Sequence, residues 1–175
     1  GTGTPKISAL DRERASRMAL SVLVRVKKDP DRAALLAQAM GKSSDATLSM
    51  KEASKVWMKD IREWQDARGK TVVDPMKEAE RLAGGRLSEH AEVRLLRATS
   101  ILHELLQKSS EGEDAARALY IAGRAYDQLG EIGLWNLHEF YYLACIDKAP
   151  HTATAEKCYR SYDETMTLGY SGSSG

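Results

Sequence analysis

The sequence predicts an all-α protein built as an array of antiparallel helix hairpins, with an N-terminal helical segment before it. Of the 175 residues, 42% are hydrophobic, 29% are charged and only four are proline, as in soluble proteins rich in helix-forming residues. Apolar residues recur at intervals of three and four, which is the period of one helix face. An Arg-x-Tyr-Asp pattern begins at Arg124 and returns 36 residues later at Arg160, with Pro150 between the copies. A repeat of about this length is typical of arrays of helix pairs.

Residues 1–69 form the N-terminal segment, in which we expect three helices. The first covers 7–28, and its apolar side is expected to consist of Ile7, Leu10, Met18, Val22 and Val26. Asp29 is a capping residue and Pro30 suits the first position of a helix. They therefore start a second, short helix, which Gly41 ends.

The third helix is predicted from a capping box. Ser49 and Glu52 have the spacing at which each side chain satisfies an unpaired backbone amide of the first turn. The helix continues to Arg68, where Gly69 ends it. Its apolar stripe consists of Ala53, Val56, Trp57, Ile61 and Trp64. Such a stripe is either a core face, which we favour, or an exposed platform that binds peptides or stacks on bases.

The second predicted domain, residues 70–168, contains the hairpin array. Asp74 and Pro75 repeat the capping signal and start a short helix that ends at Gly84. The helix expected over 88–107 is apolar around much of its circumference, so it must pack on more than one side.

Three further helices follow in this domain. In the one predicted over 115–129, Gly123 costs about 1 kcal/mol relative to Ala, and so indicates a close contact with another helix. The next covers 134–146, after a turn at 130–133. Thr152 caps the last helix, which is expected to end near Thr167. Residues 169–175 are rich in Gly and Ser and are expected to form a flexible tail.

The segment 115–163 resembles the tetratricopeptide (TPR) family. The family pattern has a large residue, Leu-Gly and Tyr on the first helix of a unit, Gly in the turn, an aromatic residue and Ala on the second helix, and Pro at its end. In the same order this chain has Leu119, Ala122, Gly123, Tyr126, Gly130, Tyr141, Ala144 and Pro150. The helix with Tyr159 and Tyr162 resembles the first helix of another unit, and 74–107 resembles a degenerate unit. The resemblance implies a TPR-like α-solenoid.

The resemblance also implies a binding groove. In this family the first helix of each unit lines a concave side that usually binds peptides or protein segments. The matching positions are Arg117, Tyr120, Arg124, Asp127 and Gln128 in one unit, and Glu156, Arg160 and Asp163 in the next. The planar fork of Arg suits a carboxylate or a carbonyl group. Alternatively, Arg124 with Asp127 and Arg160 with Asp163 are i,i+3 pairs that make a helix face soluble. The expected function is a non-catalytic scaffold for a protein or peptide partner.

The charge distribution suggests an alternative function, which is the binding of nucleic acid or of an acidic partner. Residues 1–70 hold 15 Lys and Arg against 9 Asp and Glu, whereas 71–175 hold 11 against 16. The basic N-terminal half could guide nucleic acid or an acidic partner, and steep salt dependence would indicate this. The basic residues alternate with acidic ones, however, which is typical of an ordinary mixed surface. We therefore expect a protein or peptide partner rather than nucleic acid.

The two cysteines are placed symmetrically about the turn that follows Pro150. In an antiparallel hairpin Cys145 and Cys158 would face each other, so a disulfide can form if their Cα atoms lie within about 7 Å. The alternative is two small buried residues. A disulfide would indicate an exported protein. We expect a cell-envelope or periplasmic location on this basis, with the cytoplasm as the alternative.

Motifs for catalysis, metals and cofactors are not recognised, and we expect no enzyme activity, metal site or cofactor. His103-Glu104 and His138-Glu139 begin like a metalloprotease motif, but the second histidine is missing. The sequence has neither a CxxC motif nor a glycine-rich phosphate loop. Its apolar runs are far shorter than the roughly 20 residues that span a membrane.

Overall fold

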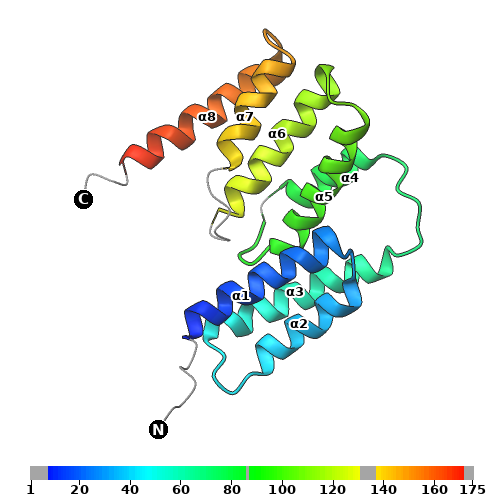
Figure 1. Cartoon of the computed structure of the whole chain (residues 1–175), viewed down its shortest axis with the longest axis vertical. Helices are drawn as coiled ribbons and strands as arrows, with labels where there is room; N and C mark the ends of the chain where they lie inside the picture. The colour runs from blue at the N-terminus through cyan, green and yellow to red at the C-terminus, as the bar shows by residue number, and fades with distance from the viewer. Residues whose placement is uncertain (1–7, 86, 131–136, 172–175) are drawn as a thin grey trace. The chain divides into compact units, whose positions relative to one another are not determined.

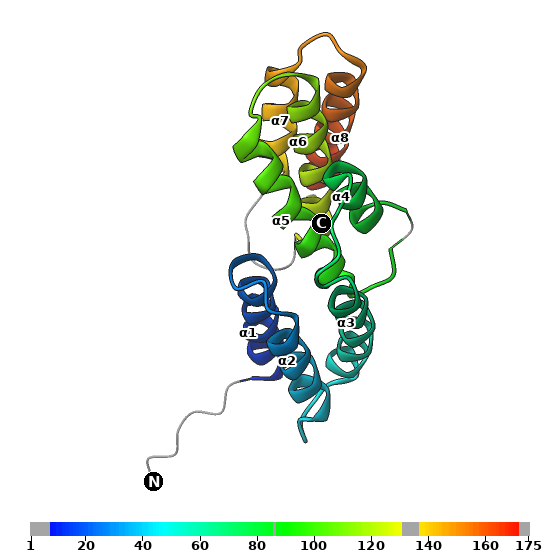
Figure 2. The same cartoon turned by 90° about the vertical axis from the view of Figure 1, so that its right-hand side faces the viewer.

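The computed structural model describes residues 8–85, 87–130 and 137–171 (Figures 1 and 2). These residues form α-helices and one π-helical turn, without any strand, which confirms the all-α class. The helices are α1 (Ala9–Ser21), η1 (Val22–Val26), α2 (Pro30–Lys42), α3 (Leu48–Asp66), α4 (Pro75–Ala83), α5 (Glu92–Lys108), α6 (Gly112–Gln128), α7 (Leu137–Lys148) and α8 (Ala153–Ser171). None of them is long and apolar enough to cross a membrane.

Three of the four predicted helix caps are confirmed. Asp29 and Asp74 each accept a hydrogen bond from a backbone amide of the first turn, and Thr152 does the same for Ala155 at 3.1 Å. The predicted capping box of α3 is wrong. Thr47, and not Ser49, caps this helix by accepting the Met50 amide at 3.1 Å. The Ser49 hydroxyl instead donates to Glu13, because it faces α1.

Chain contacts divide the molecule into two compact units. Unit 1 comprises Gly1–Thr71 and Arg86–Leu96, and unit 2 comprises Val72–Gly85 and Arg97–Gly175. The predicted boundary at residues 69–70 lies close to the first division. The return of Arg86–Leu96 to unit 1 has no counterpart in the predicted domains, because α5 contributes to both units and carries no break in its apolar pattern.

In unit 1, α2 packs between neighbours: it contacts α1, η1 and α3 (Figure 1). Ala53, Trp57 and Ile61 of α3 are completely buried, which confirms a core face at these positions of the stripe, whereas Val56 and Trp64 are only partly buried. The other fully buried apolar residues of the unit are Leu20, Val24, Ala33, Ala37, Val93 and Leu96. Trp57 is therefore a core residue and not an exposed stacking platform.

The predicted apolar face of the first helix is wrong. Met18 is 62% exposed and Val26 is 70% exposed, and Leu10 and Val22 are exposed as well. The buried side chains are Leu20 and Val24, which lie four residues apart on a different face. Two faces of this segment thus carry apolar residues at the same spacing, and packing selects the one with Leu20. Ile7 lies outside the described residues.

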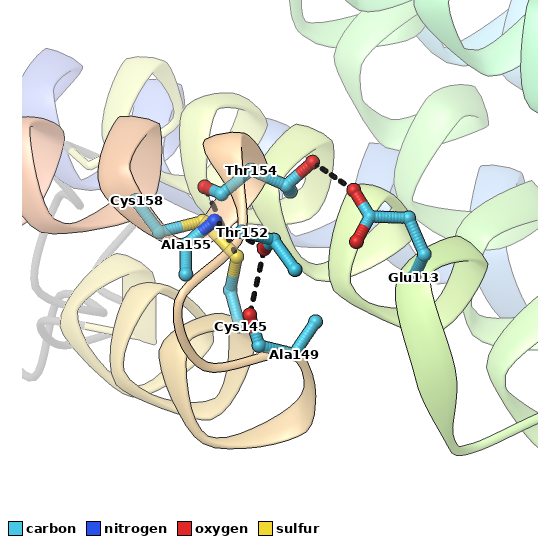
Figure 3. The surroundings of a disulfide bond; sticks show 7 residues. All are labelled: Glu113, Cys145, Ala149, Thr152, Thr154, Ala155 and Cys158. Atoms are coloured by element: carbon cyan, nitrogen blue, oxygen red, sulfur yellow. Dashed lines mark hydrogen bonds between the residues drawn. A yellow bond between two sulfur atoms is a disulfide. The ribbon is translucent and has the colours of Figure 1, made fainter.

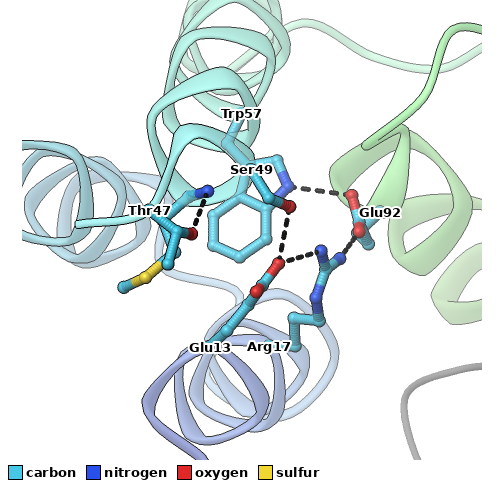
Figure 4. A network of polar contacts seen from close by, with 7 residues as sticks. Glu13, Arg17, Thr47, Ser49, Trp57 and Glu92 are labelled. Atoms are coloured by element: carbon cyan, nitrogen blue, oxygen red, sulfur yellow. Dashed lines mark hydrogen bonds and ion pairs between the residues drawn. The ribbon is translucent and has the colours of Figure 1, made fainter. Parts of the chain in front are cut away.

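A partly buried polar network joins three elements of unit 1 (Figure 4). The Arg17 guanidinium forms ion pairs with Glu13, at 2.8 Å, and with Glu92. The indole N–H of Trp57 donates to the other Glu92 oxygen at 2.9 Å. Arg17, Glu13 and Glu92 are all mostly shielded from solvent. The negative charges of the two carboxylates are therefore compensated mainly by the Arg17 guanidinium and only weakly by water.

In unit 2, α6 packs against α7, α7 packs against α8, and α6 also contacts α4 and α8. The three helices α6, α7 and α8 lie side by side in Figures 1 and 2. Tyr142 of α7 is 1% exposed and lies in a core of Ala116, Leu119, Cys145, Ala149 and Cys158. A Cβ atom at Gly123 would lie 2.6 Å from Cε1 of Tyr142, which confirms the predicted close helix contact.

The two cysteines form a disulfide between α7 and α8 (Figure 3). Their Cα atoms are 6.3 Å apart, within the limit of about 7 Å for a disulfide. Beside the bond, the Thr154 hydroxyl donates to Glu113 of α6 at 2.6 Å. The start of α8 is therefore tied covalently to α7 and by a hydrogen bond to α6.

The C-terminal helix extends beyond its predicted end. It reaches Ser171, whereas the sequence placed its end near Thr167 and a tail over 169–175. Residues 172–175 lie outside the described residues, as do Trp135 and the turn predicted after Gly130.

Candidate functional site

A cleft of about 260 Å³ lies where α4, α6 and α8 meet in unit 2, and we call it the α8 cleft. Each of the three helices contributes side chains to it. The lining residues are Glu80, Ala83, Gly84, Arg117, Tyr120, Ile121, Arg124, Thr154 and Lys157. Ala83, Tyr120 and Ile121 give the lining an apolar and aromatic part, while three other lining side chains are cationic.

The cations of the α8 cleft differ in their partners. Arg117 forms an ion pair with Glu80, and both side chains are nearly half exposed. The Arg124 guanidinium lies 6.0 Å from the ring centre of Tyr120, a distance at which the ring attracts a cation. Within the part of the chain that the structure describes, neither Arg124 nor Lys157 forms an ion pair. Two positive charges of the cleft lining are therefore not held in ion pairs within the described residues.

A second cleft of about 410 Å³ adjoins the first, and we call it the α5 cleft. Side chains of α4, α5 and α6 line it, including Lys77, Lys108, Asp74 and Asp114. Glu80 and Arg117 line both clefts, so their ion pair lies where the two hollows meet.

The structure brings together three of the eight predicted groove residues. Arg117, Tyr120 and Arg124 all line the α8 cleft. The remaining five do not line it: Asp127, Gln128, Glu156, Arg160 and Asp163. The predicted alternative pairs are not formed in the described residues either, because Arg160 pairs with Glu156 at 2.5 Å and Arg124 with no acidic residue.

Two residues of α8 that sequence reasoning missed line the cleft in place of the predicted ones. Thr154 and Lys157 lie in its first turns, three residues apart and thus on one face. The 36-residue offset matches Arg124 to Arg160, which lies one turn further along α8. The repeat pointed to the helix that lines the cleft, but to a residue one turn beyond the lining, since the place where α6 and α8 approach depends on their packing.

A second group of polar side chains in unit 2 is aromatic. His103 Nε2 lies 2.9 Å from the Tyr126 hydroxyl and 3.1 Å from the Tyr141 hydroxyl. The Tyr126 and Tyr141 rings stack with centroids 4.9 Å apart. His103, Tyr126 and Tyr141 come from α5, α6 and α7, so these contacts connect three helices. We assign these contacts a structural role and no role in binding.

Burial and then the charge of Asp127 raise the pKa of Tyr142 far above its ordinary value of 10.0. This phenol is therefore neutral at any physiological pH. It is a core group and supplies no acid or base to the cleft.

One group in unit 1 has the composition of a cation site. Ligand atoms of Glu52, Glu89 and His90 lie within 4.8 Å of one another. Both carboxylates are exposed, and such groups are common on protein surfaces without an ion. We assign no metal to it.

Comparison with protein-family models, with curated proteins and with solved structures found no match to this chain.

Proposed function

We propose that this protein is a non-catalytic scaffold that binds a protein or peptide segment in the groove of a TPR-like helical array. The observation that carries the proposal is the lining of the α8 cleft. Its side chains come from α4, α6 and α8, which would be the first helices of successive helix pairs in such an array. In the family that the sequence resembles, the first helices line the peptide groove.

The chemistry of the cleft supports binding rather than catalysis. Its charged groups are Arg117, Arg124, Lys157 and Glu80, and the one carboxylate is held by Arg117. Arginine and tyrosine are enriched where protein partners bind most tightly, since they offer large contact areas together with polar groups. The cleft thus has the composition of a binding surface.

The alternative through the basic N-terminal half has weaker support. Arg12 pairs with Asp45, Arg17 with Glu13 and Glu92, and Arg68 with Asp31. Cations that are neutralised within the chain attract a polyanion less strongly. We propose the groove as the principal binding surface for this reason.

We also propose that the protein works in an oxidising compartment such as the cell envelope. The support is the Cys145–Cys158 disulfide, because bonds of this kind persist in oxidising compartments and are rare in reducing ones.

Two substitutions on α8 test the groove. Lys157 lines the cleft and Arg160 does not, although both are exposed cations on the same helix. In a pull-down from the native source, Lys157→Ala should lose partners that wild type and Arg160→Ala retain. Identical partner sets for the two variants would contradict the groove assignment.

A further inference from the structure

The positive charge of the α8 cleft indicates which kind of peptide it would bind. Arg117, Arg124 and Lys157 face it, against the single carboxylate of Glu80. Glu113 lies beside its rim, where it accepts the Thr154 hydroxyl at 2.6 Å. Two of the three cations have no ion-pair partner among the described residues. An occupant with carboxylates would complete this arrangement, whereas a basic segment would be repelled.

The third cation is available for exchange. The Arg117–Glu80 pair has side chains that are 45% and 40% exposed. Pairs as exposed as this contribute little to stability, so a ligand carboxylate can replace Glu80 at small cost. The Arg117 fork can then bind two carboxylate oxygens at once.

The position of the Arg117–Glu80 pair indicates the path that a bound segment would follow. Glu80 and Arg117 line both the α8 cleft and the α5 cleft. A segment that contacts Arg117 from the α8 cleft therefore reaches the opening of the second hollow. It can continue along the α5 cleft, past Lys77 and Lys108. An internal stretch of chain can pass through both hollows in this way.

From these observations we infer that the occupant is an acidic, extended, internal segment of a partner protein, whose side-chain carboxylates bind Arg124 and Lys157. The inference rests on the proposed function and adds the chemistry of the partner. Tyr120 assists by holding Arg124 near its ring.

A protein segment suits this path better than a nucleic acid. A nucleic acid presents phosphates at regular intervals and is held by a run of cations. The α5 cleft is lined by two aspartates, Asp74 and Asp114, as well as by the cations Lys77 and Lys108. Such a mixed lining repels regularly spaced phosphates but accommodates a peptide that carries acidic residues at some positions only.

A display library tests the inference. Random twelve-residue peptides, joined to Gly/Ser linkers at both ends on a phage coat protein, are selected on the whole chain. Selected peptides are then synthesised in two forms, one with acetylated and amidated ends and one with a free C-terminal carboxylate. Their dissociation constants are measured at low and moderate salt, and single-stranded DNA is tested as a competitor. Arg124→Ala and Lys157→Ala are compared with the matched exposed variant Arg160→Ala.

We expect the selected peptides to be enriched in Asp and Glu and to bind more weakly as salt rises. Arg124→Ala and Lys157→Ala should each weaken binding by about tenfold, since each removes a charge-assisted hydrogen bond. Arg160→Ala should bind like wild type.

Other results would overturn the inference in distinguishable ways. Peptides that depend on Arg124 and Lys157 but lack acidic residues would contradict the acidic occupant and leave the proposed groove intact. Binding only by peptides with a free C-terminal carboxylate would contradict an internal segment. Single-stranded DNA that competes more strongly than the peptides at the same residues would replace the protein partner by a nucleic acid. Peptides that bind equally well to all variants would contradict both the inference and the groove.

Discussion

Gly123 of α6 lies against the ring of Tyr142 of α7, so closely that a Cβ atom at position 123 would be 2.6 Å from Cε1. Because Tyr142 is 1% exposed and surrounded by the unit 2 core, its ring cannot move aside easily. The contact lets α6 and α7 approach, and Arg117, Tyr120 and Arg124 are carried on the same helix as Gly123.

We predict that Gly123→Ala destabilises the protein. Alanine gains about 1 kcal/mol in helix propensity, but overpacking a filled core costs roughly 1 to 3 kcal/mol. Urea denaturation followed by circular dichroism measures the sum. The double-mutant cycle with Tyr142→Leu is the control, because Ala should cost less once the ring is gone. An Ala variant that is more stable than wild type would contradict the close contact.

Reduction of the disulfide should lower the stability of unit 2. A cross-link that closes a loop of this length contributes about 3 kcal/mol by restricting the unfolded chain. The midpoint of urea denaturation should therefore fall when reductant is added to the wild type. Cys145→Ala/Cys158→Ala should start at the lower midpoint and be insensitive to reductant. A wild-type midpoint that reductant does not change would contradict a stabilising cross-link.

Replacement of Arg17 should be costly, since it leaves Glu92 and Glu13 without their cation. Breaking a shielded ion pair from one side typically costs about 3 kcal/mol. We predict this loss for Arg17→Met, measured by urea denaturation. Arg68→Met is the matched control, because Arg68 and its partner Asp31 are both more than half exposed and the loss of this pair should have little effect. Equal stabilities of the two variants would contradict a structural role for the Arg17 network.

The pH dependence of stability should include a contribution from Glu13. Burial alone would raise the pKa of this carboxyl, but hydrogen bonds from Arg17 and Ser49 outweigh it and lower the pKa below its ordinary value of 4.5. The contribution is complete above the unfolded pKa and disappears as pH falls through the lower folded pKa. The difference in free energy of unfolding between wild type and Glu13→Gln should therefore shrink as the pH falls below the ordinary value of 4.5. A difference that grows toward acid would contradict the sign.

Local signals in the sequence predicted the helices well. The pairs Asp29-Pro30 and Asp74-Pro75 define helix starts through capping and the fixed backbone angle of proline, and these depend on neighbouring residues only. Thr47 and Ser49 both precede the α3 stripe, and tertiary structure decided between them, because Ser49 is used by Glu13.

Packing decided what local signals could not. Leu20 and Met18 are both apolar on the first helix, and only the fold determines which is buried. On α8 the repeat pointed to Arg160, but the cleft receives Lys157 instead. Which turn of α8 lies against α6 depends on how the helices pack together. The disulfide and the Thr154–Glu113 hydrogen bond are part of that packing.

The central claim, that a protein segment binds in the α8 cleft, is tested most directly by site-specific photo-crosslinking. Tyr120 lines the cleft, whereas Tyr159 is 59% exposed on α8 and lies outside the lining. A benzophenone amino acid replaces each tyrosine in turn, and the crosslinks to a partner from the native source are compared.

We predict that the partner is crosslinked from position 120 and not from position 159. The crosslink should disappear when Arg124→Ala and Lys157→Ala are added, because the segment is no longer held. A partner that is crosslinked from position 159 but not from position 120 would contradict the account.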